Sequence, residues 1–155
     1  MSESTVSRDG GCRCGRVRFR LSALPFLTMA CHCKGCQRMT GGPYSLSVAV
    51  PSEGFSVTTG APVIGGLHGA IRHYFCSYCM SWLFTRPDGL DWFVNVRATM
   101  LDEVDWFVPF IETCTDEKLP WVVTPAVRSF AVFPTIEEYG DLTRQYAEYA
   151  AKPEM

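Results

Sequence analysis

Seven of the eight cysteines fall into three short groups with the spacing of metal ligands: Cys12-x-Cys14, Cys31-x-Cys33-x-x-Cys36 and Cys76-x-x-Cys79. On an extended backbone, C-x-C directs both side chains to the same side. A C-x-x-C turn brings two thiolates to the separation that tetrahedral zinc requires. Thiolates favour zinc or iron–sulfur clusters over hard cations, and these spacings match neither standard ferredoxin pattern. The sequence therefore predicts zinc bound by cysteines.

Seven ligands predict two sites, because a closed structural zinc takes four protein ligands and a catalytic zinc takes three. Spacing alone leaves two divisions open. The first has a closed site of Cys12, Cys14, Cys76 and Cys79, and an open site of Cys31, Cys33 and Cys36. The second has a zinc ribbon of Cys33, Cys36, Cys76 and Cys79, and leaves Cys12, Cys14 and Cys31. The first is simpler because its open site is local in sequence.

Disulfides are an alternative use of eight cysteines, but residues 1–11 are polar and lack the apolar region of a signal peptide. No apolar run is long enough to span a membrane. We therefore expect a cytoplasmic protein, where thiols stay reduced. A single structural zinc with three spare thiols is another alternative, although such thiols would be prone to oxidation. Cys114 lies outside the groups and is expected to be an inert, buried thiol.

The composition indicates one globular domain over residues 1–155, with 47 % hydrophobic and 19 % charged residues. The net charge of −2 argues against a nucleic-acid-binding protein, which would carry a basic excess. Alternating or apolar runs predict strands at 16–21, 44–50, 55–59, 71–75, 81–84, 92–96, 105–111 and 130–133. Thr135 and Glu138 form a capping box that predicts a C-terminal helix over about 135–151. The cysteine groups are thus expected on a mainly β framework.

Three segments, GGCRCGRVRFRL, CHCKGCQRMTGG and YFCSYCMSWLF, resemble the glutathione-dependent formaldehyde-activating enzyme (Gfa) family, which includes centromere protein V-like proteins. Residues 95–102 and the tripeptide at 120–122 are also similar, so the resemblance covers about residues 10–123. It implies an all-β, Mss4-like fold that holds two zinc ions per chain. It also implies the first division of ligands: Cys12, Cys14, Cys76 and Cys79 at a structural zinc, and Cys31, Cys33 and Cys36 at a catalytic zinc.

The resemblance implies an enzyme with carbon–sulfur lyase chemistry, in which glutathione and formaldehyde combine as S-hydroxymethylglutathione. One departure is Met80, since the family usually has glycine after its last cysteine pair. Glycine there permits a positive φ, and a methionine at such a position would be strained by roughly 1 kcal/mol or more unless the turn differs.

Three thiolates on Zn²⁺ leave a site with net charge −1, which is a poorer Lewis acid than a three-histidine zinc. Such a site suits a thiolate substrate better than activated water. Lys34 and Arg38 are candidate contacts for the carboxylates of a small thiol such as glutathione, or else solvated surface charges. His32, the middle residue of a C-x-C, is expected to point away from the metal.

Three functions follow from these features. The leading one is a Gfa-like lyase that acts on a thiol adduct, with neither nucleic acid nor membrane as a partner. The alternative is a non-catalytic, zinc-stabilised binding module of the same fold. A redox enzyme similar to methionine sulfoxide reductases would need a reactive cysteine outside the zinc groups, and the acidic residues around Cys114 argue against that.

Overall fold

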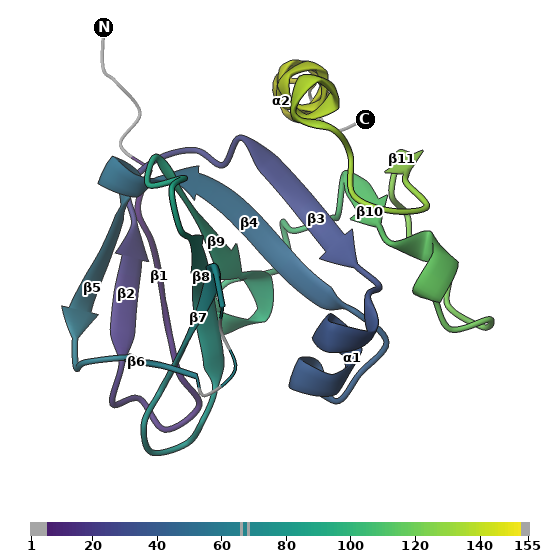
Figure 1. Cartoon of the computed structure of the whole chain (residues 1–155). Helices are drawn as coiled ribbons and strands as arrows, with labels where there is room; N and C mark the ends of the chain where they lie inside the picture. The colour runs from purple at the N-terminus through teal and green to yellow at the C-terminus, as the bar shows by residue number, and fades with distance from the viewer. Residues whose placement is uncertain (1–5, 66, 68, 153–155) are drawn as a thin grey trace, which may run out of the picture. The chain divides into compact units, whose positions relative to one another are not determined.

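A computed structural model describes residues 6–65, 67 and 69–152 of the chain (Figure 1). The chain divides into two compact units. The first comprises residues 1–25 and 47–107, and the second comprises residues 26–46 and 108–155. Each unit contains one group of cysteines. No helix among the described residues is both long enough and apolar enough to cross a membrane.

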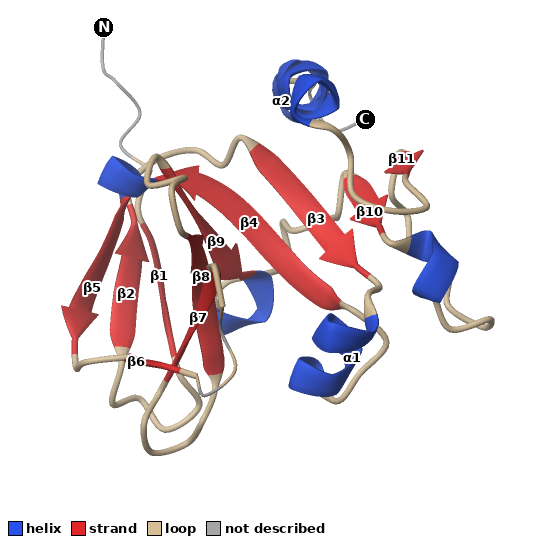
Figure 2. Ribbon diagram, viewed as in Figure 1, coloured by secondary structure: helices blue, strands red, loops and turns tan. Residues whose placement is uncertain are grey.

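The first unit is built from antiparallel strands (Figure 2). One sheet has the order β1 (Arg8–Gly11), β2 (Arg18–Leu21) and β5 (Phe55–Thr59). A second run has the order β4 (Ser45–Pro51), β9 (Phe93–Arg97), β8 (Trp82–Pro87), β7 (Ile71–Phe75) and β6 (Val63–Ile64), and the first two residues of β4 belong to the other unit. Short 3-10 helices occupy Ser52–Gly54 and Ala98–Met100.

Aromatic side chains fill the core of the first unit. The ring of Phe55 lies 5.6 Å from that of Phe19 and 4.7 Å from that of Phe84. Val94 and Val96 on β9 are fully buried, as the alternation of a half-buried strand requires. This core fixes the two loops that carry cysteines, since one follows β1 and the other joins β7 to β8.

The second unit contains a parallel arrangement in which β10 (Ile111–Thr113) lies between β3 (Leu27–Cys31) and β11 (Arg128–Ser129). Helix α1 (Lys34–Thr40) follows β3, and a 3-10 helix (Thr115–Glu117) follows β10. Helix α2 (Ile136–Ala150) buries Leu142 and Tyr146 and lies against β3. The register places Thr113 opposite Cys31.

The expected all-β class is confirmed, and most of the predicted elements are present. The predictions at 55–59 and 71–75 coincide with β5 and β7, and four others overlap β2, β4, β8 and β9. The predicted C-terminal helix is α2, and both halves of the expected capping box between Thr135 and Glu138 are formed. These elements carry strong local signals, so tertiary packing did not need to override them.

Two strand predictions are wrong. Residues 105–110 form turns and loop, because the N–H of Phe107 bonds to the carbonyl of Val104 and Pro109 has no N–H to give to a ladder. Residues 130–133 are irregular, and the two-residue strand β11 ends just before them at Ser129. The sequence patterns also gave no sign of β1, β3, β6 and α1. Of these, α1 has only seven residues, too few to show a helical period.

Two candidate metal centres

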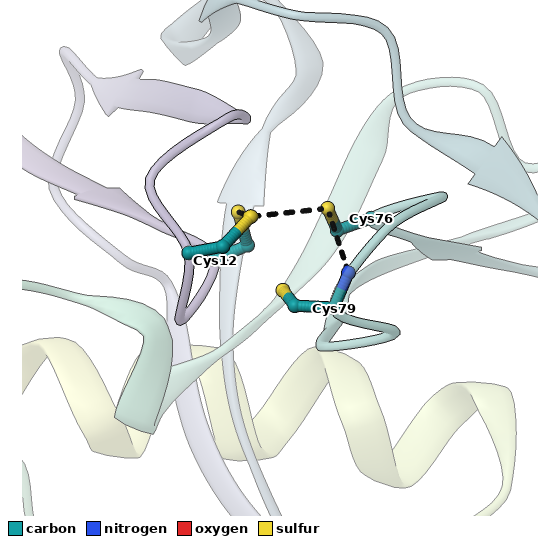
Figure 3. Close-up of side chains that lie close together, drawn as sticks. Cys12, Cys76 and Cys79 are labelled. Atoms are coloured by element: carbon teal, nitrogen blue, oxygen red, sulfur yellow. Dashed lines mark hydrogen bonds between the residues drawn. The ribbon is translucent and has the colours of Figure 1, made fainter.

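The first centre lies in the first unit and consists of Cys12, Cys14, Cys76 and Cys79. Their Sγ atoms all lie within 4.8 Å of one another. The Sγ of Cys14 is 3.5 Å from that of Cys12 and 3.8 Å from that of Cys76. Figure 3 shows sulfurs from the two separate loops turned toward one another. A tetrahedral zinc with Zn–S bonds of 2.3 Å separates its sulfurs by about 3.8 Å, so these thiols fit such an ion.

Backbone N–H groups support these thiols. The N–H of Val17 donates to Cys12 Sγ at 3.2 Å, and the N–H of Cys79 donates to Cys76 Sγ at 3.5 Å. Met80, which follows the Cys76-x-x-Cys79 turn, has φ of 60°. Methionine therefore adopts the left-handed conformation that favours glycine, and the backbone strain costs roughly 1–3 kcal/mol. Arg16 lies 3.6 Å above the ring of Tyr78 and joins the two loops.

The second centre lies in the second unit and consists of Cys31, Cys33 and Cys36, whose Sγ atoms also lie within 4.8 Å of one another. Cys31 ends β3, and Cys33 is the N-cap of α1, where its Sγ accepts from the N–H of Cys36 at 3.3 Å. All three thiols are half-buried. Within the part of the chain that the structure describes, no fourth Cys, His, Asp or Glu completes this group at that distance.

Both groups therefore have the ligand types and spacing of the division that the resemblance implied. The ribbon division, in which Cys33 and Cys36 join Cys76 and Cys79, does not correspond to either group. The thiols of the second centre also compete for protons. A hydrogen bond from Cys36 lowers the pKa of Cys31 to about 5, and the same contact raises the pKa of Cys36. The first thiol of the group thus loses its proton easily, whereas deprotonation of the next is unfavourable beside the first negative charge. A divalent cation bound between the thiolates removes this repulsion.

His32 lies between two of these cysteines but is not one of the ligand atoms in the group. It is fully buried and held by three contacts. Its N–H donates to the carbonyl of Thr113 at 3.0 Å, and its own carbonyl accepts from Nε2 of Gln37 at 2.7 Å. Its ring Nε2 donates to Oε1 of Glu112 at 2.7 Å. These contacts fix the backbone that links Cys31 to Cys33.

Glu112 is a functional candidate that the sequence analysis missed. Burial raises the pKa of this carboxyl, but hydrogen bonds from Ser129 and His32 outweigh that effect, so its pKa lies below the ordinary value. The hydroxyl of Ser129 donates to Oε2 at 2.8 Å. The signal was an acidic residue directly after the apolar run 107–111, since a buried carboxylate needs partners.

Cys114 lies beside the second centre, although its position in the sequence suggested a separate thiol. It is 5 % exposed and directly follows Thr113, the residue that pairs with Cys31 across β10 and β3. Burial, together with the negative charge of Cys31, raises the pKa of Cys114 to about 12. The phenol of Tyr139 on α2 is affected in the same way, because burial and then the charges of Cys31 and Cys114 raise its pKa to about 12.

The two candidate anion contacts lie on α1. Lys34 and Arg38 are both exposed, and the backbone N–H of Lys34 lies 3.4 Å from Oε1 of Glu117. Their helix begins at the second centre, so both belong to the surface next to these thiols.

Comparisons with known proteins show which family and which structures this chain resembles. The family model described as glutathione-dependent formaldehyde-activating enzyme matches residues 7–117. A Halomonas elongata protein whose name assigns it to the glutathione-dependent formaldehyde-activating enzymes is 33 % identical over 139 residues, which cover 81 % of this chain and 88 % of that protein. A Rhodobacter sphaeroides crystal structure shares the fold with a TM-score of 0.53 at 20 % identity, and covers 63 % of this chain and 91 % of that one.

Proposed function

We propose, from the premise that the chain belongs to the glutathione-dependent formaldehyde-activating enzyme family, that it is a zinc-dependent carbon–sulfur lyase acting on a thiol adduct such as S-hydroxymethylglutathione. The proposal extends the family assignment to a reaction and to a site. In it, the second centre holds the substrate sulfur and the first centre is structural.

The observation that carries this proposal is the difference in ligand number between the two groups. Four thiols close a tetrahedral site, whereas the group of Cys31, Cys33 and Cys36 offers three. A three-ligand site leaves one position for a substrate atom. Because the three ligands are thiolates, the site is net negative and matches a soft sulfur substrate better than water.

When bound by these three thiolates, zinc supplies a fourth ligand position and a positive charge that favours the thiolate form of a substrate. The chain itself supplies the positioning. Cys33 and Cys36 are fixed by the first turn of α1, and Cys31 is fixed by β3. Lys34 and Arg38 are the cations nearest in sequence to these thiols, and in the proposal they bind carboxylates of the thiol substrate.

The proposed location is the cytoplasm. All eight cysteines lie in the described residues and are free thiols, and seven of them belong to the two centres. An oxidising compartment would pair such thiols instead of leaving them to a metal.

Cobalt substitution tests the proposal directly. Protein reconstituted with Co²⁺ at both centres is titrated with glutathione, and the thiolate-to-metal charge-transfer bands are recorded. We expect the bands to change, since a fourth sulfur enters the second centre. The Cys36→Ser variant, which keeps all four ligands of the first centre, should show no response to glutathione.

A spectrum that stays constant at saturating glutathione would contradict the thiol-binding role and would favour a non-catalytic binding module. Reaction is then followed by ¹³C NMR of labelled formaldehyde mixed with glutathione. Zinc-loaded protein should accelerate formation and breakdown of the S-hydroxymethyl adduct relative to the Cys36→Ser protein. Equal rates with the two proteins would rule out the lyase assignment even if thiol binding is observed.

A further inference from the structure

Cys114 is the one cysteine that belongs to neither centre, yet it lies against a member of the second. Cys114 directly follows Thr113, which pairs with Cys31 across the parallel strands β10 and β3. The side chain of Cys31 accordingly helps to raise the pKa of Cys114. Neighbouring strands are about 4.8 Å apart, and one residue along the strand adds about 3.3 Å. The Cα atoms of Cys31 and Cys114 are therefore expected about 6 Å apart, within the range that a disulfide spans.

The backbone at Cys114 differs from the strand before it. Cys114 has φ of 59° and ψ of 42°, a left-handed conformation that is unfavourable for residues with a side chain. A strand would direct the side chains of Thr113 and Cys114 to opposite faces. The left-handed turn ends that alternation, and the side chains of Thr113 and Cys114 both interact with Cys31, as the pKa shifts of Cys31 and Cys114 indicate.

We propose that Cys114 is a resolving thiol, which forms a disulfide with Cys31 when a hydroperoxide oxidises the second centre, and thereby releases its metal. The inference rests on the proposed function in one respect, namely that Cys31 is a metal ligand. The oxidant is hydrogen peroxide. The disulfide adds regulation to the second centre, because loss of Cys31 as a ligand leaves two thiolate ligands.

The chemistry has two steps. In the first, the sulfur of Cys31 attacks the peroxide, the O–O bond breaks, and Cys31 becomes a sulfenic acid while the second oxygen leaves as water after taking up protons. In the second, the sulfur of Cys114 attacks the sulfenic sulfur, the S–O bond breaks, and the thiol proton leaves with that oxygen as a second water. The peroxide gains two electrons, and the two cysteine sulfurs lose them.

Two features favour Cys114 over the other thiols as the partner. Cys33 and Cys36 share the metal with Cys31 in the proposed centre, so either one reaches the oxidised sulfur of Cys31 only after giving up its own bond to the metal. Cys114 is outside the ligand group and keeps a free sulfur. The first centre differs, since all the cysteines of its unit are members of its group. Oxidation should therefore act selectively on the second centre.

The experiment uses the zinc-loaded full-length protein. Zinc content is measured first, and the protein is then treated with hydrogen peroxide. Zinc release is followed with a chelating dye, and free thiols are alkylated before non-reducing peptide mapping by mass spectrometry. We expect release of one zinc per chain, a cross-linked peptide containing Cys31 and Cys114, and recovery of zinc binding after dithiothreitol.

The control variants are Cys114→Ser, which keeps the size of the side chain, and Cys114→Gly, which also suits the positive φ. Both should retain two zinc ions before oxidation, release the second at least several-fold more slowly, and carry Cys31 as higher oxides. A map that shows only cross-links among Cys31, Cys33 and Cys36, with unchanged release from the variants, would overturn the proposal. A single zinc before oxidation contradicts the proposed second centre instead, and the peptide map still reports on the pair.

Discussion

The two cysteine groups use the same side chain in different surroundings, and the two groups differ in what a bound ion would join. At the first, four thiols come from two loops that are distant in sequence, so a bound ion joins β1 to the β7–β8 hairpin. At the second, three thiols come from a single stretch of six residues, so an ion there joins nothing that the chain does not already join. A metal that closes a long loop stabilises the fold more than one bound within a short segment.

The hydrogen bonds that support the two groups of thiols also differ. Thiols of the first centre accept hydrogen bonds from backbone N–H groups of their own loops, such as that from Cys79 to Cys76 Sγ. At the second, most of the support reaches the backbone between the ligands, through His32, Glu112 and Gln37. The first arrangement is typical of a structural ion, and the second holds three ligands in place without adding a fourth.

Ligand substitutions should give the largest difference. Cys76→Ser removes a ligand that closes a long loop, and structural zinc contributes on the order of 10 kcal/mol to folding in small zinc domains. We expect this variant to lose cooperative unfolding or to drop in Tm by more than 15 °C. Cys36→Ser should lose one zinc per chain and keep Tm within a few degrees. Elemental analysis and calorimetry measure both, and equal losses of Tm would show that the two centres do not differ in role.

A chelator should separate the two centres by rate. Three thiolates with an open position exchange faster than four that close a site. With excess chelating dye, we expect one zinc per chain to leave at least ten times faster than the other. Cys36→Ser should lack the fast phase. A single rate for both ions would contradict the open-site assignment.

The buried pair of His32 and Glu112 should affect only the second centre. Glu112→Gln weakens a charge-assisted hydrogen bond that fixes the backbone between two ligands, and loss of such support typically costs 10- to 100-fold in metal affinity. We expect about a tenfold weaker second zinc with the first unchanged, measured by competition with a chelator of known affinity. Glu117→Gln, at an exposed acidic residue that contacts the backbone of Lys34, is the matched control and should stay within a factor of two.

Met80→Gly should act on the first centre and not on the second. Glycine relieves the positive φ at the turn of the first centre, which is worth roughly 1–3 kcal/mol of strain, less the greater freedom of glycine in the unfolded chain. A net gain of about 1 kcal/mol in the free energy of unfolding is expected from denaturant titration. Zinc content should not change. A lower stability would mean that contacts of the methionine side chain outweigh its backbone strain.

The smallest effect is expected at Gly140 in α2. A Cβ added there meets no atom within 4 Å, so Gly140→Ala should stabilise the helix by about 1 kcal/mol or less. The residue lies in the second unit, whereas Met80 lies in the first. If the two units unfold together, both variants shift one transition. If only one of two transitions responds to each variant, the units unfold separately.

Much of the fold was predictable where the local pattern is strong. The alternation of 55–59 and 71–75 gives β5 and β7 at their observed bounds, and the capping box gives α2. Short or irregular elements were not predictable. Helix α1 depends on Cys33 as its N-cap, and β3 pairs with β10 across a long stretch of sequence. Parallel pairing leaves no turn signal in the sequence.

The cysteine spacing alone predicts three local groups of thiols, because C-x-C and C-x-x-C fix local geometry. Only the tertiary structure decided which distant pairs meet, since Cys14 and Cys76 are brought to 3.8 Å by strands that pair across the first unit. It likewise decided that Glu112 holds His32 and that Cys114 lies against Cys31. These contacts depend on strand register, which the hydrophobic core fixes and which no local motif records.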